Sequence, residues 1–191
     1  MGNQADRAAG SRLILVKHAM PMVTPGAPPT SWPLSEEGRV AAKALGEKLK
    51  AWSPTAIVAS YEAKAFDTAR AMAEVLGLTT GQDPGLGEHL NETGDFLDRE
   101  VIEARIELMF AQPDKLVHGE ETGDQARERF AAAIARQRRA HPTGTLVLAA
   151  HGRVIALWAS RELGIEAMPL WRRLGLPSAL VIGGDGYEIV D

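Results

Sequence analysis

The sequence has 191 residues, of which 45% are hydrophobic and 24% are charged, a balance typical of a soluble globular protein. A net charge of −4 provides no basic excess for binding nucleic acid or anionic membrane, and the lack of cysteine excludes disulfides and cysteine-based phosphatase chemistry. The longest aliphatic run, residues 13–16, is too short for a transmembrane helix or a signal peptide, so we expect a cytoplasmic protein with no nucleic-acid or membrane partner.

The first part of the chain predicts a leader, a strand, a loop and a helix in that order. Residues 1–11 are small and polar without periodicity, so we expect a disordered leader before a single domain over residues 12–191. The apolar run 13–16 predicts a strand buried on both faces of a parallel sheet. Five prolines make residues 19–33 a loop, and the stretch 35–52 predicts a helix because a serine N-cap precedes an apolar stripe.

Strands and helices continue to alternate along the rest of the chain, interrupted by the glycine-rich, acidic stretch 78–98, which has no clear period. The further predicted elements are a strand at 56–59, helices at 65–76, 102–110 and 124–139, a strand at 145–150, a helix at 154–163, and a closing hairpin of strands at 179–182 and 187–190. This alternation predicts an α/β fold, a three-layer sandwich with a largely parallel central sheet and helices on both faces. The hairpin offers an edge for a homodimer.

Reactive side chains follow three of the predicted strands. Lys17 and His18 close the first strand, Ser60 closes the second with Lys64 one helical turn later, and His151 closes the third. Ligands of open α/β sheets bind outside the carboxyl ends of the strands, so these groups are expected to share one crevice. Each residue alone has a structural alternative: His18 is a structural histidine at a strand end, His151 a hydrogen bonder in a loop, Ser60 a helix cap, and Lys17 and Lys64 solvated surface lysines. Together they form a compact positive site on an acidic protein, which predicts a phosphorylated ligand.

The motifs around these residues resemble those of the histidine phosphatase superfamily, the phosphoglycerate mutase-like branch 1. Residues 15–19 (LVKHA) resemble the family's L-V-R-H-G signature, 34–39 its L-S-x-x-G-x segment, 60–69 its S-x-x-x-R-A-x-x-T-A segment, 86–88 its L-x-E acid and 150–152 its S-H-G, while 119–121 lie near its G-E-S. The strings occur in the family's order over roughly residues 13–163. The resemblance implies a phosphoglycerate mutase-like fold.

The resemblance also implies a reaction, in which a phosphomonoester is hydrolysed through a phosphohistidine. His18 would attack phosphorus, and Glu88 would act as general acid and then as general base. Lys17, Lys64 and His151 would hold the phosphoryl oxygens, because phosphoryl transfer needs an in-line nucleophile and fixed positive donors. The implied enzyme is a metal-independent phosphatase of a small-molecule substrate that requires no cofactor.

Several alternatives remain open at this point. Glu92 and Asp95 lie in the same acidic loop as Glu88, and either Glu88 or Glu92 could supply the acid. Lys17 and Lys64 replace the two arginines of the family, and an ammonium lacks the planar fork with which guanidinium binds phosphate. A catalytically weak or inactive phospho-ligand binder is therefore the second hypothesis. A phosphomutase or an unrelated α/β protein is the third, and the short chain favours hydrolysis over a mutase.

Overall fold

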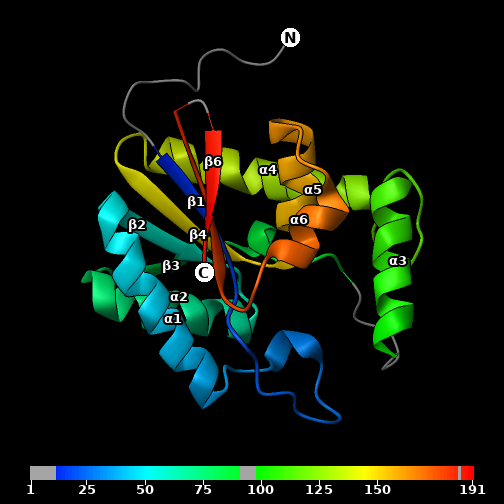
Figure 1. Cartoon of the computed structure of the whole chain (residues 1–191), viewed down its shortest axis with the longest axis horizontal. Coiled ribbons are helices and arrows are strands. Elements are labelled where there is room, and N and C mark those ends of the chain that lie inside the picture. The colour runs from blue at the N-terminus through cyan, green and yellow to red at the C-terminus, as the bar shows by residue number, and fades with distance from the viewer. Residues whose placement is uncertain (1–11, 91–97, 185) are drawn as a thin grey trace.

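One sheet organises the protein, and its strands run in the order β3-β2-β4-β1-β5-β6 (Figure 1) in a computed structural model that describes residues 12–90, 98–184 and 186–191. In chain order the elements are β1 (Arg12–Lys17), α1 (Glu36–Leu49), β2 (Pro54–Ala59), α2 (Ala63–Leu76), β3 (Thr80–Gln82), α3 (Arg99–Ala111), α4 (Gly123–Ala140), β4 (Thr145–Ala150), α5 (Gly152–Leu163), α6 (Ala167–Arg173), β5 (Ser178–Gly183) and β6 (Gly186–Val190), with 3-10 helices η2 (Pro29–Ser31), η3 (Lys50–Trp52) and η4 (Pro84–Leu86). Strands β1 to β4 pair in parallel, whereas β5 and β6 pair antiparallel. The largely parallel sheet predicted from the sequence is confirmed.

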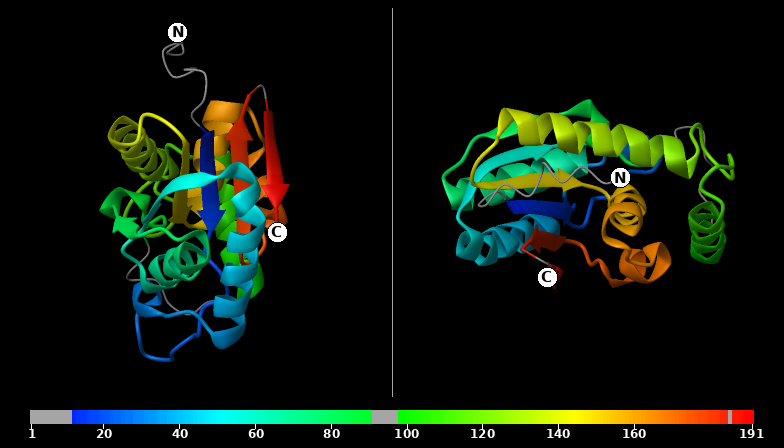
Figure 2. Two further views of the ribbon diagram at one scale, coloured as in Figure 1. Left: turned by 90° about the vertical axis from the view of Figure 1, so that its left-hand side faces the viewer. Right: turned by 90° about the horizontal axis from the view of Figure 1, so that it is seen from above.

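Helices cover both faces of this sheet, which makes the protein a three-layer α/β sandwich (Figure 2). Leu13 and Leu15 of β1 pack in one core cluster with side chains of α4, α5 and α6. Ile14 and Val16 point to the other face and pack with side chains of α1 and α2. All four are fully buried, as expected for a strand with apolar cover on both sides.

The proline-rich segment 19–33 is tied to the start of α1 by hydrogen bonds. The backbone N–H of Ser35 donates to the carbonyl oxygen of Met20 at 3.0 Å. The Ser35 hydroxyl in turn accepts from the backbone N–H of Gly38 at 3.0 Å, which makes Ser35 the N-cap that the sequence predicts. The first turn of α1 therefore holds the beginning of the loop in place.

Short elements account for the differences between the sequence prediction and the structure. The helix predicted to reach residue 52 is α-helical only to Leu49 and finishes as η3, because Ser53 adopts a left-handed backbone with φ 47°. The stretch 78–98 contains β3 and η4, and the sequence did not predict α6. The three residues of β3 are too few to show an alternating strand pattern, and the seven residues of α6 are too few to show a helical period. Pro169 inside α6 also argues against a helix there.

Two other predictions concern the ends and edge of the fold. The predicted leader, residues 1–11, lies outside the described residues, as does the segment 91–97. The β5–β6 hairpin lies at one edge of the sheet as expected, and a homodimer formed through it stays a prediction. Among the helices that the structure describes, none combines the length and apolar character needed to cross a membrane.

Gly38 leaves no room for a side chain, so we expect Gly38→Ala to lower the free energy of unfolding by about 1–3 kcal/mol. A Cβ atom at this position would lie 2.2 Å from the carbonyl oxygen of Met20, and the loop would have to move away from α1. Urea unfolding measures the change. Gly186→Ala is the matched control, since a Cβ there has no described atom within 4 Å. An equal effect of both substitutions would contradict the tight packing of Gly38.

Candidate active site

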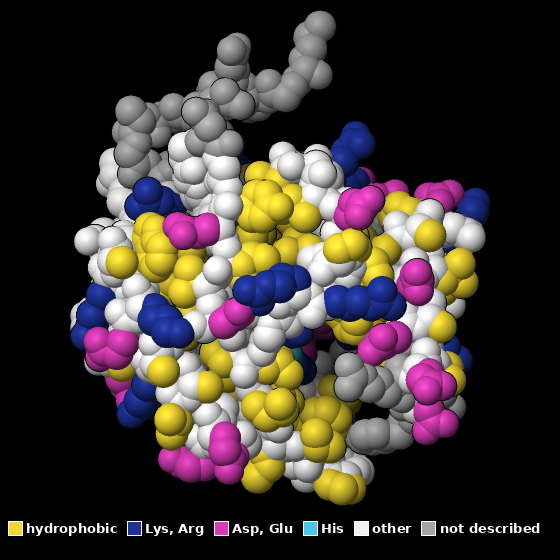
Figure 3. All heavy atoms as spheres, in the orientation of Figure 1, with side chains coloured by type: hydrophobic (Ala, Val, Ile, Leu, Met, Phe, Trp, Pro, Cys, Tyr) yellow, Lys and Arg dark blue, Asp and Glu magenta, His cyan; other side chains and the backbone are white. Residues whose placement is uncertain are grey.

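A cavity of about 480 Å³ opens where β1, β2 and β4 end. Its described lining residues come from four regions: the segment after β1, the start of α2, the turn after η4 and the start of α5. They are His18, Pro21, Pro28, Pro29, Thr30, Trp32, Glu62, Lys64, Glu88, His89, Leu90 and Arg153. Histidine side-chain atoms are visible inside a hollow on the face shown in Figure 3. The volume lies within the range of small-molecule sites.

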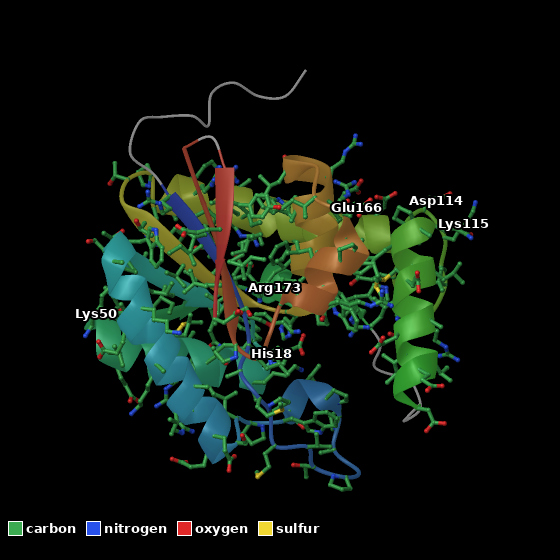
Figure 4. The ribbon with its side chains drawn as sticks, viewed as in Figure 1. His18, Lys50, Asp114, Lys115, Glu166 and Arg173 are labelled. Atoms are coloured by element: carbon green, nitrogen blue, oxygen red, sulfur yellow. The ribbon has the colours of Figure 1, made fainter. Side chains whose placement is uncertain are left out.

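His18 has a neutral ring that is protonated on one defined nitrogen. It directly follows β1 (Figure 4), and its ring Nδ1 lies 2.8 Å from the carbonyl oxygen of Ala19. A carbonyl oxygen only accepts hydrogen bonds, so Nδ1 carries the proton and donates, and in the neutral ring Nε2 keeps a free lone pair. Burial, together with the nearby His151, lowers the pKa of His18 to about 3. The ring is therefore neutral at physiological pH.

His151 lies beside His18 as a fully buried ring. The two rings stand edge to face with centroids 5.2 Å apart, and the His151 side chain is 0% exposed. Neither of its ring nitrogens has a hydrogen-bond partner among the residues that the structure describes. Burial lowers the pKa of His151 as well. The described lining residues of the cavity do not include His151, which contacts two of them, His18 and Glu62. Buried polar atoms are normally paired, so these unpaired nitrogens set His151 apart from an ordinary structural histidine.

Glu88 is held as an ionised carboxylate at the start of α5. It accepts hydrogen bonds from the backbone N–H groups of His89 at 2.9 Å and of Arg153 and Val154, each at 3.3 Å. The guanidinium Nε of Arg153 lies 3.3 Å away. Burial alone would raise the pKa of Glu88, but Arg153, His151 and these N–H donors outweigh it and hold the pKa far below its usual range.

Arg129 of α4 fixes the backbone that carries Glu88, a role that the sequence analysis missed. Its guanidinium donates to the carbonyl oxygens of Gly85 at 3.1 Å, Gly87 at 3.0 Å and Glu88 at 2.9 Å. It also donates to the carboxylate of Glu121 at 2.6 Å. The motif at residues 119–121 therefore contributes to the site through Glu121, which holds Arg129.

The two lysines predicted to bind phosphate have different surroundings. Lys64 lines the cavity, and its Nζ donates to the carboxylate of Glu62 at 2.6 Å and to the carbonyl oxygen of Pro29 at 2.8 Å. Lys17 donates instead to the carbonyl oxygen of Leu174 at 2.7 Å, and the described lining residues do not include it. Burial lowers the pKa of Lys17, partly offset by the charge of Glu88.

Glu62 is a second carboxylate in the cavity, and the sequence analysis did not single it out. One of its oxygens accepts from the backbone N–H of Glu88 at 2.7 Å and lies 3.3 Å from Nε2 of His151. The other accepts from Lys64. Ser60, two residues earlier, is buried, and its hydroxyl accepts from the Glu62 N–H at 3.2 Å. Ser60 therefore holds the turn before α2 but is not the helix cap that one interpretation of the sequence expected, because the N-cap is Glu62 and no side chain caps this helix.

Together, the fold and the cavity define a class: an α/β protein with a cavity at the carboxyl ends of its parallel strands that contains a histidine, a lysine and two carboxylates. The sequence matches the histidine phosphatase superfamily (branch 1) over residues 13–187, and the chain belongs to this family. The resemblance noted from the motifs is confirmed, and so is the fold it implies. A comparison with curated proteins found no match.

Solved structures with a similar fold include phosphatases from several organisms. A mycobacterial glucosyl-3-phosphoglycerate phosphatase in complex with inorganic phosphate shares 25% identity at a TM-score of 0.71, covering 94% of each chain. A mutant phosphoserine phosphatase from Entamoeba histolytica in complex with phosphoserine shares 14% identity at a TM-score of 0.69, covering 95% of each chain. A putative alpha-ribazole-5'-P phosphatase from Escherichia coli shares 21% identity at a TM-score of 0.65, also covering 95% of each chain.

The low pKa of His18 predicts that the protein loses stability on acidification. The unfolded chain takes up a proton on this ring near pH 6.5, whereas the folded protein does so only near its pKa of about 3. Unfolding therefore consumes a proton below pH 6.5, and between pH 6.5 and 5 the free energy of unfolding falls by about 2 kcal/mol through this residue.

Urea unfolding of wild type and His18→Asn between pH 7 and pH 5 checks this prediction. The variant is expected to lose less stability on acidification than wild type by that amount. His141→Asn, at the C-terminal end of α4, controls for the removal of a histidine elsewhere. The same pH dependence in wild type and His18→Asn would show that His18 is not held neutral.

Proposed function

We propose that this protein is a metal-independent phosphatase that hydrolyses a small phosphomonoester through a phosphohistidine on His18. The observation that carries the proposal is a pair of neighbouring rings: His18, part-buried and protonated on Nδ1, so that Nε2 has a lone pair, beside fully buried His151, whose ring nitrogens are both unpaired among the described residues. A phosphoryl group that contacts both rings from the cavity side would supply a hydrogen-bond partner for His151 and would stand next to the nucleophile. The three similar structures described above are named as phosphatases or a putative phosphatase, which favours the same class of substrate.

In the first step of the proposed reaction, Nε2 of His18 attacks phosphorus, and the bond from phosphorus to the alcohol oxygen breaks. The leaving oxygen takes a proton from Glu88. This carboxyl is ionised in the structure described, but a phosphoryl anion entering the cavity repels it and raises its pKa, so that it takes up a proton from solvent as the ester binds and has it to donate. His151 and Lys64 donate to the equatorial oxygens, where charge is spread in the transition state.

In the second step a water molecule attacks the phosphohistidine. Glu88, again a carboxylate, accepts the proton of the water, the bond from phosphorus to Nε2 breaks, and inorganic phosphate leaves with His18 restored. Lys17 belongs to the proposed phosphate-binding set as well. Its Nζ would have to leave the carbonyl oxygen of Leu174 to reach the phosphoryl group.

A phosphate-binding protein with weak or no catalysis is the second candidate, and the lysine contacts favour it. Lys64 is paired with Glu62, and Lys17 with a backbone carbonyl, so both ammonium groups already have acceptors within the protein. A compact ammonium also lacks the bidentate geometry of guanidinium. Binding of phosphate without turnover would distinguish this candidate from the first.

The direct test is phosphate release from a panel of phosphomonoesters between about pH 5 and 8 with a chelator present. We expect release by wild type and by His141→Ala, and none by His18→Ala, because only the last lacks the nucleophile. Acid quenching during turnover should trap a labelled phosphohistidine in wild type. No release by a folded wild type that binds phosphate would establish the second candidate instead.

The role of Glu88 as proton donor predicts a dependence on the leaving group. Glu88→Gln should slow hydrolysis of an alkyl phosphate by about a hundredfold or more, since a poor leaving group needs the proton. The rate of the first step with 4-nitrophenyl phosphate should fall much less, because 4-nitrophenolate is a good leaving group that needs no proton from Glu88. Single-turnover measurements compare the two substrates. Equal losses for both would assign Glu88 a role other than proton donor.

A further inference from the structure

Glu62 introduces a negative charge among the groups that would otherwise bind phosphate. Its side chain is 13% exposed, lines the cavity and contacts Lys64 at 2.6 Å. It also lies 3.3 Å from Nε2 of His151. A phosphoryl group held by Lys64 and His151 must therefore lie beside this carboxylate.

Glu62 is ionised in this environment and still has room for another hydrogen bond. Burial would raise its pKa, but His151, Lys64 and the N–H of Glu88 outweigh it and lower the pKa. A carboxylate has about four lone-pair positions. Hydrogen bonds from Lys64 and from the N–H of Glu88 use two of them, so a donor from a ligand can still be accepted.

The cavity also lacks a surplus of positive charge for a dianion. The charged and titratable groups around Glu62 are Lys64 from α2, Arg153 and His151 from the start of α5, Glu88 after η4, and His18 after β1. The lowered pKa values of His18 and His151 leave both rings neutral, so Lys64 and Arg153 balance Glu62 and Glu88. Lys17 donates to the carbonyl oxygen of Leu174 and is not among the described lining residues, so none of the described lining groups is left to balance a second negative charge on a bound phosphoryl group.

We propose that Glu62 makes this site select the singly protonated phosphoryl group, by accepting a hydrogen bond from its P–OH and repelling the dianion. The inference rests on the proposed phosphate site and adds a specificity determinant to it. The proton on the ligand satisfies the free acceptor position of Glu62, whereas a dianion presents only acceptors to a carboxylate. Phosphate monoesters lose their second proton near pH 6, so selection of the monoanion favours binding under mildly acidic conditions.

The test measures binding of inorganic phosphate and of sulfate by calorimetry at pH 5.5 and pH 8. Sulfate serves as the probe for a tetrahedral dianion because it carries no proton at either pH. Wild type is expected to bind phosphate roughly tenfold or more tightly at pH 5.5 than at pH 8, and to bind sulfate weakly at both, since a neighbouring like charge shifts such equilibria by tenfold or more.

Glu62→Gln keeps an oxygen that can accept from the Glu88 N–H and removes the charge. It is expected to gain roughly tenfold or more in phosphate affinity at pH 8 and to bind sulfate. Glu62→Ser provides a second neutral variant if the glutamine destabilises the fold, and thermal unfolding checks both. Glu74→Gln, an exposed glutamate on the same helix paired with Lys43, is the matched control and should behave as wild type.

The outcomes separate this inference from the proposed function. The inference is wrong if wild type and Glu62→Gln bind phosphate with the same pH dependence and neither binds sulfate. That result would leave the proposed phosphate site intact. Folded wild type and variants that bind no phosphate at either pH would overturn the phosphate site and the inference together. Phosphate binding at pH 8 that appears only in the neutral variants supports the inference in its strongest form.

Discussion

The parallel pairing of β4 with its two neighbours is the constraint on which the candidate active site depends. The sheet's backbone hydrogen bonds continue just past the strand ends. The N–H of His18 donates to the carbonyl oxygen of Ala150 at 3.0 Å, and the N–H of Ser60 donates to the carbonyl oxygen of Ala149 at 2.9 Å. Three segments thus leave the sheet at the same level. His18, the start of α2 and His151 meet there, although the chain between the two histidines is more than a hundred residues long.

Burial away from water lowers the pKa of the two histidines in this site and acts to raise the pKa of its two carboxylates. Burial keeps both rings neutral, whereas for Glu88 and Glu62 it is outweighed by donors and nearby positive charge, so both stay ionised. Lys64 and Arg153 then balance the two carboxylates. The positive charges around the cavity are thus offset within the protein, and the arrangement of individual donors and acceptors decides which polar ligand can fit.

The strands, most helices and the positions of the predicted reactive residues follow from local sequence. Apolar runs buried on both faces have the same signature wherever they occur, and the residue after such a run must lie at the sheet's carboxyl end. The amino-acid pattern alone therefore suffices to place His18, His151 and Lys64 at this edge of the sheet. Short elements escaped prediction because three residues in β3 and seven in α6 carry no usable period.

The sequence by itself determined the layered fold and which chain segments meet at the site, because hydrophobic periodicity and motif order are local properties. Only the tertiary structure decided which group each long polar side chain contacts. Lys17 turns to a carbonyl 157 positions away, Arg129 holds the backbone before Glu88, and Glu62 shares the cavity with Lys64. Such choices depend on side-chain direction and on contacts between distant segments, which no local pattern records.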